Sequence, residues 1–201
     1  MAHDTTLSDA HAEHGHHELP TVFGFWVYLM TDCIIFGSLF AVFAVLRNQF
    51  AGGPTGKELF EISGLALETA LLLISSITYG FGMIAAHKGQ IKSVQMWLAV
   101  TFLLGLGFVF LEVKEFAHMI AEGAGPDRSA FLSAFFTLVS THGLHVSCGL
   151  VWIIVLITQL SGVSAINERM MNKLTMLSLF WHFLDIVWIC VFTYVYLASM
   201  I

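Results

Sequence analysis

The stretch SLFWHFLDIVWICVFTYVY, residues 178–196, combines an almost continuous apolar run with two ionisable side chains near its middle. A helix needs about 20 mostly apolar residues to cross a bilayer, and this stretch with its flanks has that length. His182 and Asp185 lie about one helical turn apart, and ionisable groups in membrane helices usually face the bundle interior or a cavity. The stretch therefore predicts a membrane helix that turns one polar face towards neighbouring helices.

The composition of the whole chain extends this prediction to the full fold. Of 201 residues, 57% are hydrophobic and only 11% are charged, whereas a soluble domain carries about 25% charged residues. No basic patch is present, which argues against a nucleic-acid partner. The three cysteines lie in three different apolar segments without a C-x-x-C pair, so we interpret them as small membrane-buried residues.

Five apolar segments are long enough to span a bilayer, and linkers with glycine, proline or charged residues separate them. The sequence therefore predicts an all-α fold, an integral membrane bundle of five transmembrane helices that occupies residues 23–201. The expected spans are residues 23–46, 65–86, 94–117, 130–158 and 174–200.

Residues 1–22 form a polar, His-rich tail without lysine or arginine. A signal peptide begins with a basic region before its apolar core, so we expect the first hydrophobic segment to be retained. The histidines of HAEHGHH, residues 11–17, allow two interpretations: a flexible cluster that binds a divalent metal, or a solvated tail without a specific ligand.

Positive charges give a weak indication of orientation. With five spans, Lys88, Lys92, Arg169 and Lys173 fall on the side of the N-terminus, and Arg47, Lys57, Lys114 and Arg128 on the other. The counts are equal, but the short linker 87–93 is basic without any acid. This favours a cytoplasmic N-terminus.

Ionisable residues recur within the predicted spans, which is rare in membrane helices. They share helix faces with small residues, as in helices that approach closely and form hydrogen bonds across their interface. Three interpretations remain open: structural His–carboxylate contacts, a proton path, or a metal site built on the H-x-x-H pair of the fourth span. The proposed interior polar network consists of Asp32, Glu68, Glu112, Glu115, His142, His145, His182 and Asp185.

Several segments resemble one membrane-protein family, the subunit III of haem–copper oxidases. THGLHVSCGLVW (141–152) and WHFLDIVWICVFTYVY (181–196) are similar to its two signature stretches, and LLGLGFVFLEVKEF (103–116) places Glu115 at the family's glutamate. FGFWVYLMTDCIIFGSLFAVF (23–43) resembles the helix that opens the short form. AGGPTGKELFE (51–61) and GPDRSAFLSAFF (125–136) resemble the subunit III of bo-type ubiquinol oxidases.

This resemblance implies a non-catalytic subunit of a proton-pumping terminal quinol oxidase, which oxidises ubiquinol and reduces oxygen to water. Its expected partners are subunits I and II, which hold the haem and copper, and a small subunit IV. The chain itself is expected to carry no cofactor, no catalytic residue and no metal. In long-form members of the family, two groups of helices form a V-shaped cleft that holds lipid, so phospholipid is a candidate ligand of this chain. The expected location is the bacterial inner membrane.

The short form lacks the first two of the family's seven helices, which an extended subunit I supplies in such relatives. At the family's membrane glutamate in the opening helix, this chain has Asp32, which puts the chemistry of that glutamate in doubt. The alternatives are a subunit III of a menaquinol or cytochrome c oxidase, and a stand-alone proton-coupled or metal-ion transporter. Transporters often show inverted repeats and broken helices, and the sequence has neither.

Overall fold

The computed structural model describes residues 6–50, 62–197 and 199, and this part of the chain is helical with no strand. Five helices are long and apolar enough to cross a membrane, as the sequence predicts. The expected linker motif at 51–61 and the first residues of the polar tail lie outside the described residues. The elements are α1 (Thr6–Leu46), α3 (Ile62–His87), α4 (Ile91–Ala121), α5 (Ala130–Ser161), α6 (Glu168–Cys190) and the π-helical η1 (Val191–Leu197).

The chain divides into two units, Met1–Ile35 and Phe36–Ile201. The first unit contains the beginning of α1, which runs without a break from the polar tail into the apolar segment 22–46. Asp32 belongs to this unit, whereas the other members of the proposed polar network belong to the second.

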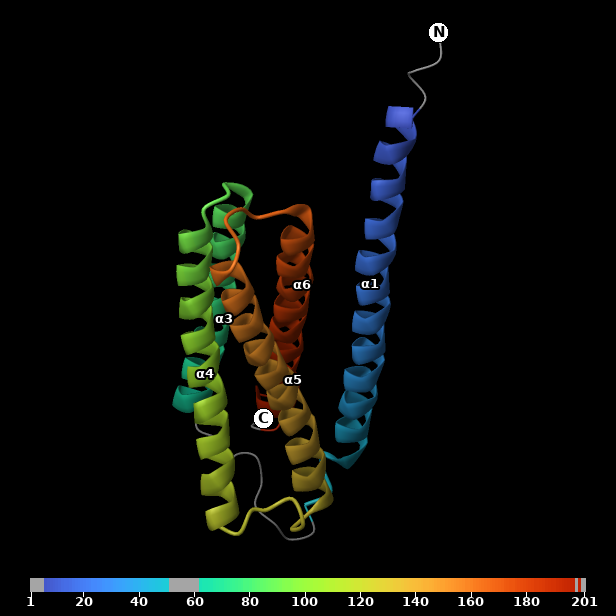
Figure 1. Cartoon of the computed structure of the whole chain (residues 1–201). Coiled ribbons are helices and arrows are strands. Elements are labelled where there is room, and N and C mark those ends of the chain that lie inside the picture. Colours follow the sequence, from blue (N-terminus) through green and yellow to red (C-terminus); the bar gives the residue numbers. More distant parts are fainter. Residues whose placement is uncertain (1–5, 51–61, 198, 200–201) are drawn as a thin grey trace. The chain divides into compact units, whose positions relative to one another are not determined.

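Four helices of the second unit form a bundle in which each helix packs against two others (Figure 1). α3 contacts α4 and α6, and α5 contacts α4 and α6, so the four helices close a ring around one core. Short connections make successive helices antiparallel, as in an up-and-down bundle. The turn between α3 and α4 and the connection between α5 and α6 therefore lie at the same end (Figure 1).

Local sequence signals explain where the helices end. Gly89, with φ of 68°, follows α3, and Gly123, with φ of 78°, follows α4. A side chain rarely adopts this left-handed conformation, so glycine is the usual residue there. At the other ends, the Ser129 side chain accepts a hydrogen bond from the backbone N–H of Leu132, and Asn167 caps α6 in the same way.

The last part of α1 belongs to the second unit and packs against the bundle through aromatic rings. Phe43 lies with its ring centre 5.8 Å from that of Phe131 at the start of α5. Phe36, about two turns earlier on the same face of α1, contacts the rings of His145 and Phe183. Just beyond α1, the backbone carbonyl of Gln49 accepts a hydrogen bond from the N–H of Phe131.

Candidate functional site: the polar interior of the bundle

The core of the bundle contains two tryptophans of α6 whose indole N–H groups are paired with α3. Trp181 donates to the hydroxyl of Ser75 over 3.1 Å, and Trp188 donates to that of Thr69 over 3.1 Å. Each hydroxyl donates in turn to a carbonyl of its own helix, Ser75 to Leu72 and Thr69 to Leu65. The same arrangement therefore occurs twice, two turns apart along α6.

Glycines make room for one of these rings. A Cβ atom on Gly105 of α4 would lie 3.0 Å from the Trp181 ring, and one on Gly149 of α5 would lie 2.9 Å from it. Both distances are shorter than ordinary carbon–carbon contacts. The Trp181 ring therefore fits against α4 and α5 because these two positions have no side chain.

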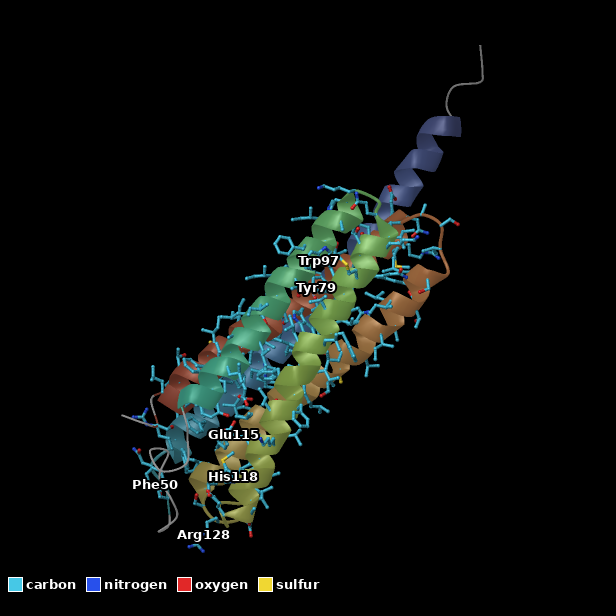
Figure 2. The ribbon with its side chains drawn as sticks, turned by 90° about the vertical axis from the view of Figure 1, so that its left-hand side faces the viewer. Phe50, Tyr79, Trp97, Glu115, His118 and Arg128 are labelled. Carbon is cyan, nitrogen blue, oxygen red and sulfur yellow. The ribbon has the colours of Figure 1, made fainter. Side chains whose placement is uncertain are left out.

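Further hydroxyl groups join the helices in the half of the bundle near the α3–α4 turn. Thr78 of α3 and Thr101 of α4 share a hydrogen bond of 2.8 Å. The buried hydroxyl of Tyr79 donates to the Leu174 carbonyl on α6 over 2.8 Å. Figure 2 shows Tyr79 and Trp97 in this half, and Glu115 and His118 in the opposite half.

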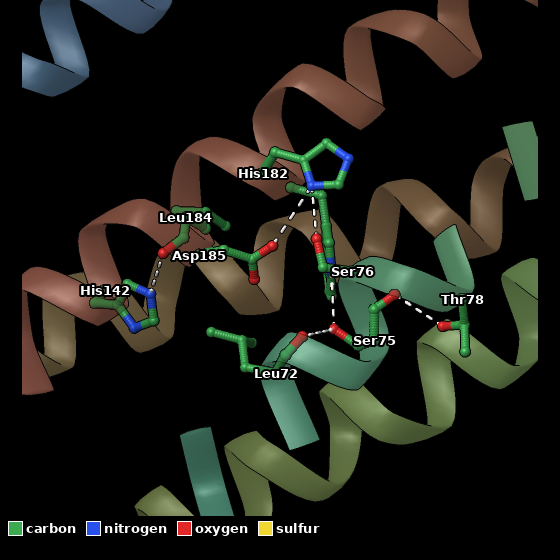
Figure 3. A network of polar contacts seen from close by, with 9 residues as sticks. Leu72, Ser75, Ser76, Thr78, His142, His182, Leu184 and Asp185 are labelled. Carbon is green, nitrogen blue, oxygen red and sulfur yellow. Dashed lines mark hydrogen bonds and ion pairs between the residues drawn. The ribbon is translucent and has the colours of Figure 1, made fainter. Parts of the chain in front are cut away.

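His142 is fully buried and contacts α6 through its ring edge and its face. Its Nε2 lies 3.2 Å from the carbonyl oxygen of Leu184 (Figure 3). The ring packs against Trp188, with centroids 5.2 Å apart, and edge-on to Phe108 at 5.8 Å. An imidazole held in this way acts as a packing and hydrogen-bonding group between α5 and α6.

His182 and Asp185 lie beside each other on α6. His182 faces α3, where its Nδ1 forms a hydrogen bond of 2.6 Å with Ser76 (Figure 3). Its side chain is 48% exposed in the chain alone, so it lies at the edge of the bundle. Asp185 is buried, and one of its oxygens lies 3.6 Å from His182 Nδ1.

His145 is half-buried on α5, where its Nδ1 lies 2.7 Å from the Thr141 carbonyl one turn earlier. The remaining three members of the proposed network, Glu68, Glu112 and Glu115, interact electrostatically with one another in a separate group. Three of the eight predicted residues, Glu68, Glu112 and Glu115, thus lie close to one another in the bundle.

The tryptophans and their hydroxyl partners were not predicted as site residues. The sequence of α3 indicated which face is interior, because Glu68, Ser75 and Tyr79 share one helix face. All three are buried in the structure. The sequence of α6 indicated its interior face less clearly. The buried positions of α6 recur at alternating steps of four and three residues and include Met170, Leu174, Leu177, Trp181, Leu184 and Trp188.

Within the described ranges, no three or more His, Cys, Asp or Glu side chains are arranged to hold a metal ion. The contacts of the interior are instead hydrogen bonds and ring contacts that join one helix to another. These contacts hold the helices of the bundle to one another.

The sequence profile of the cytochrome c oxidase subunit III family matches residues 1–200. The chain belongs to this family. It is 57% identical over 201 residues to the cytochrome bo(3) ubiquinol oxidase subunit 3 of Pseudomonas aeruginosa, with 96% of this chain and 95% of the relative covered. It is 43% identical to the quinol oxidase subunit 3 of Bacillus spizizenii, with 94% and 98% covered.

A third relative, the probable quinol oxidase subunit 3 of Staphylococcus epidermidis, is 40% identical over all of this chain and 98% of its own length. The predicted resemblance to oxidase subunit III is thereby confirmed, and the names of these relatives agree with a quinol oxidase. Membership of the subunit III family implies a complex with oxidase subunits I and II. With five apolar helices, the chain is a multi-pass bacterial membrane protein.

Proposed function

We propose that this chain is the non-catalytic subunit III of a proton-pumping terminal quinol oxidase, in which it braces the catalytic subunit. The complex oxidises quinol and reduces oxygen to water. The observation that carries the bracing role is the repeated Trp–hydroxyl contact, Trp181 with Ser75 and Trp188 with Thr69. The buried polar groups of α3 and α6 are used to hold two helices together.

The partners follow from the subunit III assignment. Haem and copper belong to subunits I and II, and the quinol binds to the complex outside this chain. A small subunit IV and phospholipid complete its surroundings. Many large apolar side chains on the outside of the helices, such as Phe110 at 67% exposed and Ile186 at 62%, suit lipid or another membrane subunit.

We place the chain in the inner membrane with residues 1–22 as a cytoplasmic tail and residues 23–201 as the membrane domain. The basic turn with Lys88 and Lys92 supports this orientation, because short cytoplasmic loops are enriched in positive charge. The connection between α5 and α6 then also faces the cytoplasm.

The bracing role is tested by purifying the oxidase with and without this chain. A partner that binds the native core stabilises it by mass action. We expect the core without this chain to begin quinol oxidation at a rate close to that of the complete enzyme, and then to lose activity faster during turnover. The measurements are the initial rate and the inactivation half-life, after spectroscopy has established equal haem content.

Two outcomes would contradict parts of this proposal. An initial rate of zero in a haem-loaded core would show that the chain takes part in catalysis. A complete enzyme that oxidises reduced cytochrome c but not ubiquinol would be a cytochrome c oxidase. A complete enzyme that is active only with menaquinol would be a menaquinol oxidase.

A further inference from the structure

Three carboxylic acids meet in the bundle half away from the α3–α4 turn, where Figure 2 shows Glu115. Glu68 extends from α3, and Glu112 and Glu115 extend from α4. The side chains of these residues, here called the acid cluster, are close enough to interact electrostatically as like charges. Glu68 and Glu112 are each only 3% exposed, while Glu115 is half-buried.

Two oxygens of the acid cluster are buried without a hydrogen-bond partner. They are Oε2 of Glu68 and Oε2 of Glu112. In the described part of the chain, no basic side chain forms an ion pair with any of the three carboxyl groups. An ionised carboxylate in an apolar interior is costly unless it is paired, and membrane carboxylates are normally paired or functional.

The backbone of α5 directly contacts the carboxyl group of Glu112. A Cβ atom on Gly143 would lie 2.6 Å from Oε1 and 2.7 Å from Oε2 of Glu112. Position 143 therefore has to be glycine, because any side chain there would overlap the Glu112 carboxyl group. The Glu112 carboxyl group of α4 therefore packs against the middle of α5, and position 143 has no space for a basic side chain that could pair with it.

The other titratable groups near the acid cluster are few. Tyr196 of η1 is buried and interacts electrostatically with all three glutamates. On α5, His142 directly precedes Gly143, but its Nε2 is engaged with the Leu184 carbonyl. Lys114 lies between the two glutamates of α4 in sequence but is exposed.

We propose that the acid cluster is a proton-binding site within the membrane domain, in which bound protons neutralise the buried carboxyl groups. Glu112 and Glu68 hold their protons, and the half-buried Glu115 exchanges its proton with the surroundings. Each binding event converts one carboxylate into a carboxylic acid and changes no other bond. The described residues offer no arrangement of three or more ligands that would favour a metal ion instead.

Infrared spectroscopy of the purified oxidase complex tests this inference, because a protonated carboxyl group has its own carbonyl stretching band. We expect a band that shifts in deuterium oxide at neutral pH in the unmodified complex and is weaker in the Glu112→Gln variant, in which Glu68 still holds its proton. Glutamine has nearly the same shape and no charge, so the variant complex should assemble normally. Glu122→Gln is the matched control, because Glu122 is 56% exposed and lies 3.4 Å from His118.

The proposal is overturned if the spectra of the unmodified complex and Glu112→Gln do not differ in this band. It is also overturned if metal analysis finds a stoichiometric cation that Glu112→Gln loses. If Glu112→Gln does not assemble, Glu68→Gln provides the same comparison, and an unchanged band there decides against the proposal. These readouts do not depend on whether the chain braces the catalytic subunit.

Discussion

At the scale of single residues, Gly149 shows how a missing side chain positions a large one. The Trp181 ring occupies the space next to this glycine, and Phe180 lies beside it, with an atom 3.3 Å from the position a Cβ would take. The glycine is therefore required for packing and has no need of an unusual backbone conformation, since it lies within α5.

We expect Gly149→Ala to destabilise the chain and to lower the yield of assembled complex. Overpacking typically costs about 1–3 kcal/mol, which exceeds the gain of roughly 0.8–1 kcal/mol in helix propensity. The measurement is thermal unfolding in detergent. Gly107→Ala is the control, because its nearest neighbour, Leu71, lies at an ordinary 3.8 Å. Equal loss of stability in both variants would show that the Trp181 contact does not decide the outcome.

At the scale of elements, the two tryptophan contacts hold α6 to α3. Hydrogen bonds between membrane helices contribute about 0.6 kcal/mol on average and up to about 1.7 kcal/mol. Each indole also contributes a large apolar surface at the same place, with Trp188 packed edge-on to Phe108 at 4.7 Å.

A double-mutant cycle isolates the polar part of this contact. We expect Trp188→Phe and Thr69→Val to show a coupling free energy of about 0.6–1.7 kcal/mol, because either substitution removes the hydrogen bond between the indole N–H and the hydroxyl. Unfolding of the single and double variants in detergent gives the value.

Trp97→Phe combined with Thr69→Val is the matched control, because Trp97 lies on α4 against Phe81. That pair should be additive. Additivity of the Trp188 pair as well would mean that its hydrogen bond does not contribute to holding the helices together.

The sequence predicted the existence of these elements better than the direction in which they face. Long apolar runs were sufficient for five helices, and the small and polar face of α3 was readable from Glu68, Ser75 and Tyr79. On α6 large apolar residues occur on every face, so His182 served as the marker of the interior, although its side chain lies at the edge of the bundle. The interior face is instead the one that carries Trp181 and Trp188.

The same limit applies to the end of the chain. Residues 191–197 read as a continuation of an α-helix, but the structure has a π-helix there. A stripe extrapolated at 100° per residue loses its phase when the number of residues per turn changes. The meeting of Glu68, Glu112 and Glu115 was equally unreadable, because spacing along each helix does not say which helices are neighbours.

At the scale of the whole molecule, the proposed topology of five spans places the two ends of the chain on opposite sides of the membrane. The bundle fixes which connections share a side, since the α3–α4 turn and the α5–α6 connection lie at one end (Figure 1). Lys88, Asp127 and Ser164 are exposed positions in the three connections of the bundle.

Single cysteines at these positions test the proposed orientation in a variant without the native cysteines. We expect a membrane-impermeant maleimide added to intact cells to label Asp127→Cys, and to label Lys88→Cys and Ser164→Cys only after the cells are opened. The reverse pattern would place the N-terminus outside. Labelling of all three from one side would contradict the five-span topology itself.

The burial of the α6 tryptophans also determines how strongly quenchers in the lipid reduce their fluorescence. Trp181 and Trp188 are at most 1% exposed, whereas Trp26 is 45% exposed on an apolar helix. Bromine atoms on lipid tails quench fluorescence only at short range, so they should reach Trp26 and leave the two buried indoles emitting. The residual emission then reports on the interior of the bundle, and a loosened contact between α3 and α6 becomes visible as dimming before the complex falls apart.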